Sequence, residues 1–226
     1  MPKTLAFDVY GTLIDTAGVV RELTGMMGDL APAFSQRWRD KQLEYSFRRG
    51  LMGEYRDFSV CTRDALEYVS AELSAPLTEE QVSHLMASYR RLPAFGDALG
   101  ALPRLKSLGH KIYAFSNGLA QDVDALLRYA GIDHFFLDIV SADEIRTFKP
   151  DPAIYRHFSM RSDTPVEHCW LISSNPFDVL GASAVGFNTA WVRRNPSVPF
   201  DPWGVEPDQI SASLTELEHA AGLHQL

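Results

Sequence analysis

The apolar residues of this chain follow two different periods, and the change of period marks out its segments. Thr4 to Val9 is a short apolar run, as expected of a buried β-strand. From Asp15 to about Ala94 the apolar residues instead recur at helical spacing, and no strand-like run interrupts them. We therefore predict a helical insert of roughly four or five helices. Two sets of apolar residues have this helical spacing. One is Phe34, Trp38 and Leu43, and the other is Ala65, Leu66, Val69 and Leu73.

After Phe95 strand-like and helix-like segments alternate. The predicted strands are Lys111–Phe115, Phe136–Val140, Cys169–Ile172 and, as the last parallel strand, Thr189–Val192. The predicted helices are Ala98–Leu108, a helix after Gly118 to about Ala130, Asp151–Met160, Phe177–Val185 and Leu214–Ala221, with Asn195–Pro207 irregular. Such alternation is typical of an open parallel sheet with helices on both faces.

The two patterns together predict an α/β fold in two parts. Residues 1–14 and 96–226 are expected to form a Rossmann-like core around the parallel sheet. Residues 15–95 are expected to form an all-helical cap subdomain inserted into that core. A chain of 226 residues has enough material for both parts.

Polar residues follow the predicted strands at the points where the strands end. Asp8 ends the first strand, Ser116 and Asn117 follow the second, Lys149 follows the third, and Ser173–Asn175 follow the fourth. Ligands of parallel sheets bind beyond the carboxyl ends of the strands. The sequence therefore predicts a catalytic crevice at this edge.

Asp8 is the candidate nucleophile of that crevice. Lys149 beside it would keep the carboxylate ionised, since a nearby positive charge lowers the pKa of an acid. Taken singly, Asp8 also suits a turn cap and Lys149 a surface lysine. The position of both residues at strand exits favours the site.

Other polar residues have structural explanations that the pattern alone leaves open. Ser116 or Asn117 suits a helix N-cap, and Asp178 suits the first turn of a helix, where the dipole favours an acid. Tyr155 suits a packing position on its helix. The arginines of Arg37–Arg39 suit a solvated helix face.

Composition narrows the partners and the compartment. The chain is 46% hydrophobic and 22% charged, and its net charge of −8 argues against nucleic acid or an anionic membrane as a partner. No secretory signal precedes the first strand, and no apolar run approaches the ~20 residues of a spanning helix. The two cysteines, Cys61 and Cys169, form neither a disulfide framework nor a metal-site pattern. We expect a cytoplasmic protein.

Five segments resemble the L-2-haloacid dehalogenases of the haloacid dehalogenase superfamily. The aspartate motif by itself marks only the superfamily, whereas the tyrosine two positions after the aspartate, the insert segment and the Ser-Ser-Asn loop are more specific. The resemblance implies the superfamily fold, a covalent aspartyl ester, no metal or organic cofactor, and a homodimer formed through the insert. The segments are Phe7–Leu13, Trp38–Tyr45, Ser116–Gly118, Lys149–Asp151 and Ser173–Asn175.

The resemblance also implies a role for each matching residue. Asp8 would attack the halogen-bearing carbon with inversion, Thr12 would hold the Asp8 side chain, and Lys149 would lie beside it. Tyr155 would support Lys149 and the surroundings of Asp8. The other implied roles are a halide contact for Arg39 and Asn117, a substrate-carboxylate contact for Ser116, positioning and activation of water for Ser173, Asn175 and Asp178, and the pocket wall for Tyr10, Leu43, Phe58 and Phe177.

Two positions depart from the family pattern. Asp40 stands next to Arg39, where an uncharged residue is more usual, and its charge would weaken the positive field on a leaving halide. Phe177 stands where tryptophan is more usual and would change the size of the pocket. Both departures concern the substrate range more than the type of reaction.

Tyr10 separates halide from phosphate chemistry. Related phosphatases carry a second aspartate there, which protonates an alkoxide leaving group, and a tyrosine with an ordinary pKa of about 10 is a poor substitute. A halide leaves without a proton. We therefore predict hydrolysis of short (S)-2-haloalkanoic acids to (R)-2-hydroxy acids.

Three alternatives remain open from the sequence. The first is another carboxylate-attack hydrolase, similar to the azetidine-2-carboxylate hydrolases, because Asp40 would suit an amine leaving group. The second is a magnesium-dependent phosphatase, with Asp8 and Asp178 as a partial metal site. The third is a binding protein without enzymatic activity.

Overall fold

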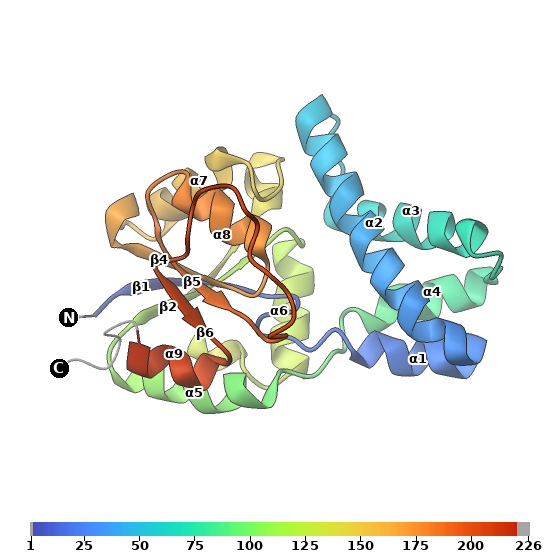
Figure 1. Ribbon diagram of the computed structural model, residues 1–226, viewed down its shortest axis with the longest axis horizontal. Coiled ribbons are helices and arrows are strands. Elements are labelled where there is room, and N and C mark those ends of the chain that lie inside the picture. The colour runs from blue at the N-terminus through green and yellow to red at the C-terminus, as the bar shows by residue number, and fades with distance from the viewer. Residues whose placement is uncertain (1, 221–226) are drawn as a thin grey trace.

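A parallel six-stranded sheet forms one side of the molecule and a group of four helices the other (Figure 1). The computed structural model describes residues 2–220. The sheet has the order β3-β2-β1-β4-β5-β6, and every neighbouring pair is parallel. The strands are β1 (Thr4–Asp8), β2 (Lys111–Ser116), β3 (Asp138–Ser141), β4 (Cys169–Ser173), β5 (Asn188–Val192) and β6 (Gln209–Ser211).

The helices form two groups along the chain. The first four helices after β1 are called the insert here: α1 (Gly18–Met27), α2 (Ala31–Met52), α3 (Phe58–Glu72) and α4 (Glu79–Ser88). The others accompany the sheet: α5 (Gly96–Ser107), α6 (Ala120–Tyr129), α7 (Pro152–Arg161), α8 (Pro176–Ser183) and α9 (Leu214–Ala220). The predicted α/β class is confirmed. The predicted end of the last helix, Ala221, lies outside the described residues.

The sheet is buried on both faces, as the continuous apolar runs of its strands require. Leu5 and Phe7 of β1 point to one face and join the core packed under α5 and α6, whereas Ala6 points to the other and packs with Ile154 and Phe158 of α7. Figure 1 shows α5 and α9 below the sheet and α7 and α8 above it. Successive side chains of β1 therefore pack into two separate hydrophobic cores, one on each face of the sheet.

Some predicted boundaries were wrong for physical reasons. Thr189–Val192 is not the last strand, because β6 adds one more parallel strand beside β5. Its pattern is inverted: Gln209 and Ser211 are buried while Ile210 is exposed, so no apolar run marks it. Strand β3 begins at Asp138 rather than Phe136, which follows a short 3₁₀ turn. Leu43 is only half-buried and does not continue the Phe34–Trp38 stripe.

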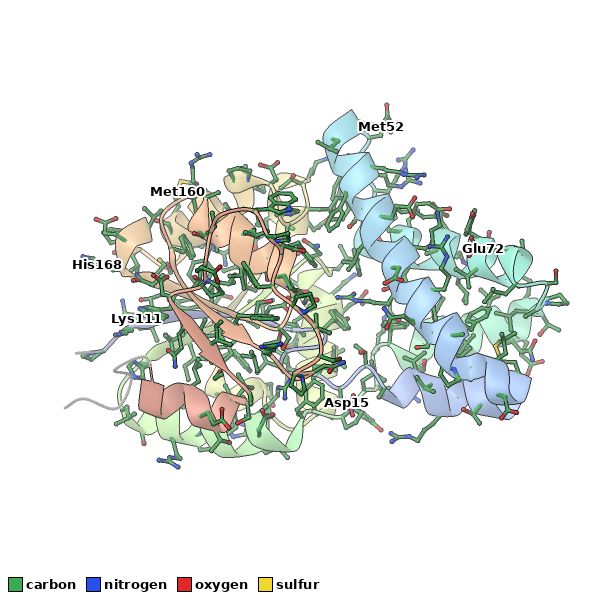
Figure 2. The ribbon with its side chains drawn as sticks, viewed as in Figure 1. Asp15, Met52, Glu72, Lys111, Met160 and His168 are labelled. Atoms are coloured by element: carbon green, nitrogen blue, oxygen red, sulfur yellow. The ribbon has the colours of Figure 1, made fainter. Side chains whose placement is uncertain are left out.

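The insert is joined to the sheet by two chain passages that run side by side. Asp15 N donates to Pro93 O at 2.9 Å, and Phe95 N donates to Leu13 O at 2.9 Å. In Figure 2, Asp15 marks the point where the chain leaves the sheet, and Met52 marks the free end of α2. The carboxyl ends of the strands point toward the insert (Figure 1). The polar residues at the strand ends therefore face the insert.

Two helices of the insert, α3 and α4, begin at capping side chains, whereas α1 and α2 have no side-chain cap. Asp57 accepts hydrogen bonds from Ser59 N and Val60 N at the start of α3. Thr78 and Gln81 form a reciprocal capping box at the start of α4.

Within residues 2–220, no helix combines the length and apolar character needed to cross a membrane.

Candidate active site

The candidate site lies where the direction of strand connections reverses. From β1 the chain proceeds to β2 on one side of it and later returns to β4 on the other. Such a switch point is the usual place for a ligand in an open parallel sheet. Asp8 is paired with Phe115 of β2, so the loops after β1, β2 and β4 meet around its side chain.

The Asp8 carboxylate is buried and held by three side chains. Its Oδ2 accepts from Thr12 Oγ1 at 2.7 Å and from Asn175 Nδ2 at 2.8 Å. Its Oδ1 accepts a single, longer bond from Lys149 Nζ at 3.1 Å. Asp8 is 8% exposed, so only a small part of the carboxylate faces the cleft. The two oxygens are therefore unequal: Oδ2 is fully engaged and Oδ1 is freer.

Lys149 lies between two carboxylates and uses all three of its donors within the protein. Besides Asp8, Nζ donates to Asp178 Oδ2 at 2.8 Å and to Phe115 O at 2.8 Å. The ammonium also lies 4.1 Å from the centre of the Phe115 ring. Lys149 is 1% exposed. It is a buried counter-charge, and the surface lysine considered from the sequence is wrong.

Tyr155 supports the site through Asp178. Its hydroxyl donates to Asp178 Oδ1 at 2.8 Å and lies 3.1 Å from Asp178 O. The expected packing role is also present, because its ring contacts Phe115 and Phe187. Burial raises the pKa of the Asp178 carboxyl to about 6, with the Lys149 ammonium opposing the rise. Asp178 therefore changes its protonation state closer to neutral pH than an ordinary aspartate does.

The loops after β2 and β4 are folded by their own polar groups. Ser116 Oγ accepts from Gly118 N at 3.0 Å, and Asn117 Oδ1 accepts from Lys149 N at 2.8 Å. Neither residue caps α6, whose N-cap is Leu119 without a side-chain bond, so the capping alternative is wrong. Ser173 Oγ accepts from Asn175 N at 3.1 Å. Ser173 therefore shapes the loop that brings Asn175 to Asp8.

One face of α2 turns toward the sheet side of the cleft. Phe47 contacts Phe177 of α8 with ring centres 5.1 Å apart, and a Cβ placed on Gly50 would lie 3.8 Å from Phe148. Arg39 and Leu43 lie four-residue steps earlier on this same face. The Arg39 guanidinium opposes the rise in pKa of the Tyr10 phenol, which places it near that ring. Residues 2–220 provide no hydrogen-bond or ion-pair partner for Arg39.

The other charged residues around Arg39 point elsewhere. Arg37 forms a two-point ion pair with Glu72, at 2.6 and 2.7 Å, on the surface of the insert. Asp40 is exposed and accepts from Gln36 Nε2 at 2.9 Å. The geometry therefore favours Arg39 over Arg37 as the halide contact that the resemblance implies. The Asp40 carboxylate bonds Gln36 at the surface, which does not support the expectation that its charge weakens that contact.

The expected wall residues contact different parts of the cleft. Tyr10 and Phe58 line a cavity of about 490 Å³ between the insert and the sheet side. Phe177 packs against Phe47, and Leu43 shares the face of α2 described above. Desolvation raises the pKa of the Tyr10 phenol well above its usual range, with the Asp122 carboxylate adding to the rise. Tyr10 is thus a poorer acid than an ordinary tyrosine.

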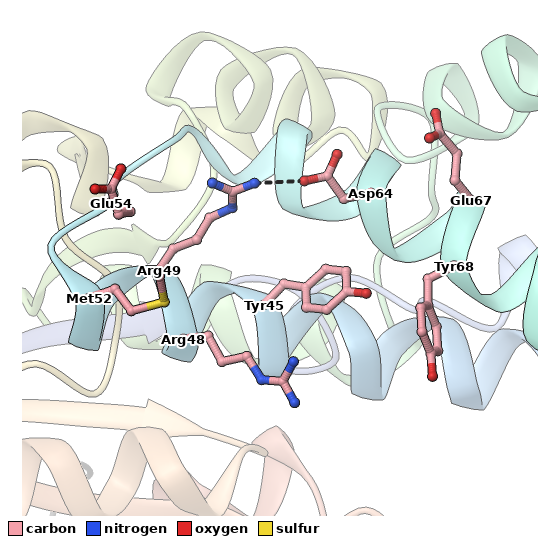
Figure 3. Close-up of a pocket in the computed structure, with 8 residues that line it drawn as sticks. All are labelled: Tyr45, Arg48, Arg49, Met52, Glu54, Asp64, Glu67 and Tyr68. Carbon is pink, nitrogen blue, oxygen red and sulfur yellow. Dashed lines mark hydrogen bonds and ion pairs between the residues drawn. The ribbon is translucent and has the colours of Figure 1, made fainter.

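A larger hollow lies away from these residues, on the insert. It measures about 770 Å³ and lies between the second half of α2 and the middle and second half of α3 (Figure 3). Figure 3 shows Tyr45 and Tyr68 along one side and the bond between Arg49 and Asp64, 2.8 Å long, across it. None of the expected site residues lines it. Its size therefore does not make it the active site.

Arg194 was missed in the sequence. It follows β5, and its Nη2 donates to Thr12 O at 2.6 Å while its Nη1 donates to Asp97 Oδ2 at 2.9 Å. Its guanidinium stacks 3.7 Å from the centre of the Phe95 ring. Arg194 thereby fastens the Thr12 loop and the returning passage from the insert together. In the sequence, the one indication of this contact is Asp97 in the first turn of a predicted helix. An acidic residue there is already explained by its interaction with the helix dipole.

Comparison with known proteins agrees with this geometry. A family model of haloacid dehalogenase-like hydrolases matches residues 2–186, so the chain belongs to that class of hydrolases. Two curated relatives are each 35% identical: (S)-2-haloacid dehalogenase 2 of Pseudomonas sp. strain CBS-3, over 95% of this chain and 93% of the relative, and (S)-2-haloacid dehalogenase of Pseudomonas sp. strain YL, over 97% and 96%.

A solved structure gives the same result. The L-2-haloacid dehalogenase from Xanthobacter autotrophicus with chloropropionic acid covalently bound superimposes with a TM-score of 0.92 at 30% identity, over 100% of both chains. This chain therefore belongs to the L-2-haloacid dehalogenase family. The family and the superfamily fold expected from the sequence are confirmed.

Proposed function

We propose that this protein hydrolyses short (S)-2-haloalkanoic acids to (R)-2-hydroxy acids and halide through an ester on Asp8. The observation that carries the proposal is the buried Asp8 carboxylate, whose Oδ2 is held by Thr12 and Asn175 while Oδ1 keeps free lone pairs. Relatives named (S)-2-haloacid dehalogenase, similar over nearly their whole length, support it.

In the first step Asp8 Oδ1 attacks the carbon that bears the halogen, from the side opposite the halide. The carbon–oxygen bond forms as the carbon–halogen bond breaks, so the configuration inverts. Arg39 and Asn117 receive the halide, and Ser116 contacts the substrate carboxylate. A nucleophile held in place before reaction lowers the barrier, because positioning alone contributes on the order of 7–11 kcal/mol.

In the second step water attacks Cγ of the Asp8 ester. Asp178 accepts the proton of this water, and Ser173 and Asn175 help to position it. The negative charge that develops on Oδ2 meets the Thr12 hydroxyl and the Asn175 amide, which already donate to that atom at 2.7 and 2.8 Å. The pair thus acts as an oxyanion hole. The bond between Cγ and Oδ1 then breaks, and Oδ1 leaves with the product and takes the proton held by Asp178 to become its hydroxyl group. Asp8 returns to a carboxylate that carries one oxygen of water and releases the remaining proton to solvent.

The donor set around Asp8 does not fit a magnesium ion, which argues against the phosphatase alternative. Mg²⁺ prefers an octahedral shell of oxygen ligands. The place between Asp8 and Asp178 is instead taken by Lys149 Nζ, at 3.1 and 2.8 Å. Within residues 2–220, no group of three or more His, Cys, Asp or Glu lies together as metal ligands would. Tyr10, with its raised pKa, is also unsuited to protonate an alkoxide.

A halide-release assay tests the proposal. (S)- and (R)-2-chloropropionate, 2-bromopropionate and fluoroacetate are incubated with the protein, with and without chelator. Chloride or bromide release from the (S) acids, unaffected by chelator, is the expected result. Phosphate release from a phosphate monoester that stops with chelator, without halide release, would contradict it.

Heavy-oxygen water tests the covalent step. In a single turnover in H₂¹⁸O the first product is expected to be unlabelled, because its new oxygen comes from Asp8. The label is expected in the Asp8 peptide, read by mass spectrometry. Label in the first-turnover product would show direct attack by water instead.

Hydrolysis of the ester is expected to depend on the ionisation of Asp178. While Asp8 is ionised, burial raises the pKa of the Asp178 carboxyl to about 6 and the Asp8 charge adds to the rise, so esterification of Asp8 is expected to lower this pKa. Where Asp178 is protonated it cannot accept the proton of water, and the rate of ester breakdown should fall about tenfold per pH unit. Rapid-quench measurement of ester decay between pH 3.5 and 8 gives this profile. A rate of ester decay that does not change over this range would contradict the role of Asp178.

Replacing Arg194 by methionine is expected to lower kcat several-fold and the free energy of unfolding by about 1–3 kcal/mol, because Thr12 O and Asp97 each lose a buried donor. Activity assays and urea unfolding measure the two effects. Arg193→Met is the matched control, since the Arg193 guanidinium donates to carbonyls of the following loop, at Val198 O and Pro196 O. Equal effects in both variants would contradict the link from Arg194 to the nucleophile loop.

We further propose that residues 15–95 act as a cap and that the protein is a cytoplasmic homodimer associated through the insert. Leu51 and Met52 support the dimer, because they are 91% and 70% exposed at the end of α2. Two large apolar side chains at one helix end favour a contact. Sedimentation equilibrium is expected to give twice the chain mass, and Met52→Glu is expected to lower it. A single-chain mass for the unchanged protein would contradict the dimer.

A further inference from the structure

Tyr89 follows the last residue of α4, on the passage that returns from the insert to the sheet. It lines the same cavity of about 490 Å³ as Tyr10, and the centres of these two rings are 6.2 Å apart. Its ring also meets Trp38 of α2 edge-on, with centres 5.0 Å apart. The Tyr89 ring therefore contacts both α2 and the loop that follows the nucleophile.

The hydroxyl oxygen of Tyr89 accepts a hydrogen bond within the protein, but its hydrogen has no acceptor there. Gln42 Nε2 donates to that oxygen at 2.8 Å, and Gln42 is fully buried. Across residues 2–220 no atom accepts the hydroxyl hydrogen of Tyr89. A carboxylate that lines the same cavity, Asp122, is paired with Arg90 instead. The bond from Gln42 thus orients the hydroxyl and leaves its hydrogen available.

The Arg39 guanidinium, which has no partner among residues 2–220, lies near this hydroxyl. Arg39 stands three positions before Gln42 on α2, so their side chains are neighbours on the helix surface. Burial raises the pKa of the phenols of Tyr10 and Tyr89, and the charge of Arg39 opposes the rise at both. Because burial keeps the Tyr89 phenol protonated near neutral pH, its hydroxyl stays a donor. A cation and an O–H donor without protein acceptors suit a small anion.

We propose that Tyr89 determines specificity for the leaving group, its hydroxyl donating to the departing halide beside Arg39. The inference rests on the proposed function and adds a donor to it. As the carbon–halogen bond breaks, its electron pair leaves with the halide, and the proton stays on the phenol oxygen because a halide is a very weak base. A donor aimed at the developing charge lowers the barrier of this step. Chloride leaves less readily than bromide and concentrates its charge more, so chloride release is expected to depend more on Tyr89.

Halide release in a single turnover tests this donor, because it reports the first step alone. Tyr89→Phe keeps the ring and removes the hydroxyl. With (S)-2-chloropropionate the rate is expected to fall about ten- to hundredfold, as for other hydrogen bonds to a charged group. With (S)-2-bromopropionate the fall is expected to be about threefold smaller. The ratio of the bromide rate to the chloride rate should therefore rise in this variant.

Tyr113→Phe is the matched control, because it removes the hydroxyl of a buried tyrosine on β2 that packs against Phe158 and does not line the cavity. Its rates with both acids should equal those of the unchanged protein, and thermal melts check that both variants fold. Slowing of both acids by one factor in Tyr89→Phe would overturn the inference and leave Tyr89 a packing residue. Unchanged rates would overturn it as well. Absence of halide release by the unchanged protein would instead count against the proposed function.

Discussion

Replacing Asp8 by asparagine is expected to abolish halide release from (S)-2-haloacids, with a loss on the order of 10⁴-fold or more in kcat. The amide oxygen is a weak nucleophile, so the ester does not form. The new side chain can still accept from Thr12 at the position of Oδ2, and Lys149 keeps its partner Asp178, so the fold is expected to persist. Ion chromatography of released halide and a circular dichroism spectrum measure the two properties.

Asp40→Asn is the matched control for this substitution. It makes the same chemical change at an exposed aspartate on α2, whose carboxylate faces Gln36. Its kcat should stay within about twofold of the unchanged protein, since surface changes away from the site have small effects. An Asp8→Asn variant as active as this control would contradict the covalent mechanism and favour one that does not use Asp8.

Replacing Lys149 by methionine is expected to cost both activity and stability. The ammonium is buried and compensates two carboxylates, so removing it leaves Asp8 and Asp178 facing each other without a counter-charge. Breaking a buried pair in this way typically costs about 3–5 kcal/mol. The loss in kcat is expected to reach about 10³-fold, because the orientation of the nucleophile and the charge state of the base both change.

The stability cost of Lys149→Met is expected to grow with pH. Burial already raises the pKa of Asp178 to about 6, and loss of the ammonium raises it further, so at pH 5 the buried acid is protonated and neutral. At pH 8 the Asp178 carboxyl of the unfolded chain has lost its proton. Folding of the variant must then either bury the ionised carboxylate or bind a proton from solvent, and both lower the free energy of unfolding. Urea unfolding at both pH values measures the difference. Lys111→Met, at an exposed lysine, is the control. Equal losses at pH 5 and pH 8 would contradict this account.

The convergence at the sheet edge was predictable from the sequence because it follows from topology. Parallel strands place their carboxyl ends together, so Asp8, Lys149 and Asn175 meet although more than a hundred residues separate the first from the other two. Apolar runs are enough to locate such strands. The hydrogen bonds of Thr12 and Tyr155 needed more than the pattern, and the family resemblance supplied their residues.

Other features were not predictable because local pattern does not encode them. Strand β6 buries Gln209 and exposes Ile210, the reverse of the usual signal. The direction of Asp40 depends on its angular place on α2 relative to the sheet, which is known only when the insert is docked. Arg194 reaches Thr12 across 182 positions of sequence. Such contacts arise from tertiary packing alone.

The division of the site between the sheet and the insert has an evolutionary consequence. Every side chain bonded to Asp8 comes from loops of the sheet part, and the two residues that bond Asp178 come from one of these loops and from α7. In the proposed mechanism the insert supplies the Arg39 guanidinium that receives the halide, and two chain passages join the insert to the sheet. New specificities can therefore arise by grafting or reshaping one contiguous module while the bond-making chemistry is inherited unchanged.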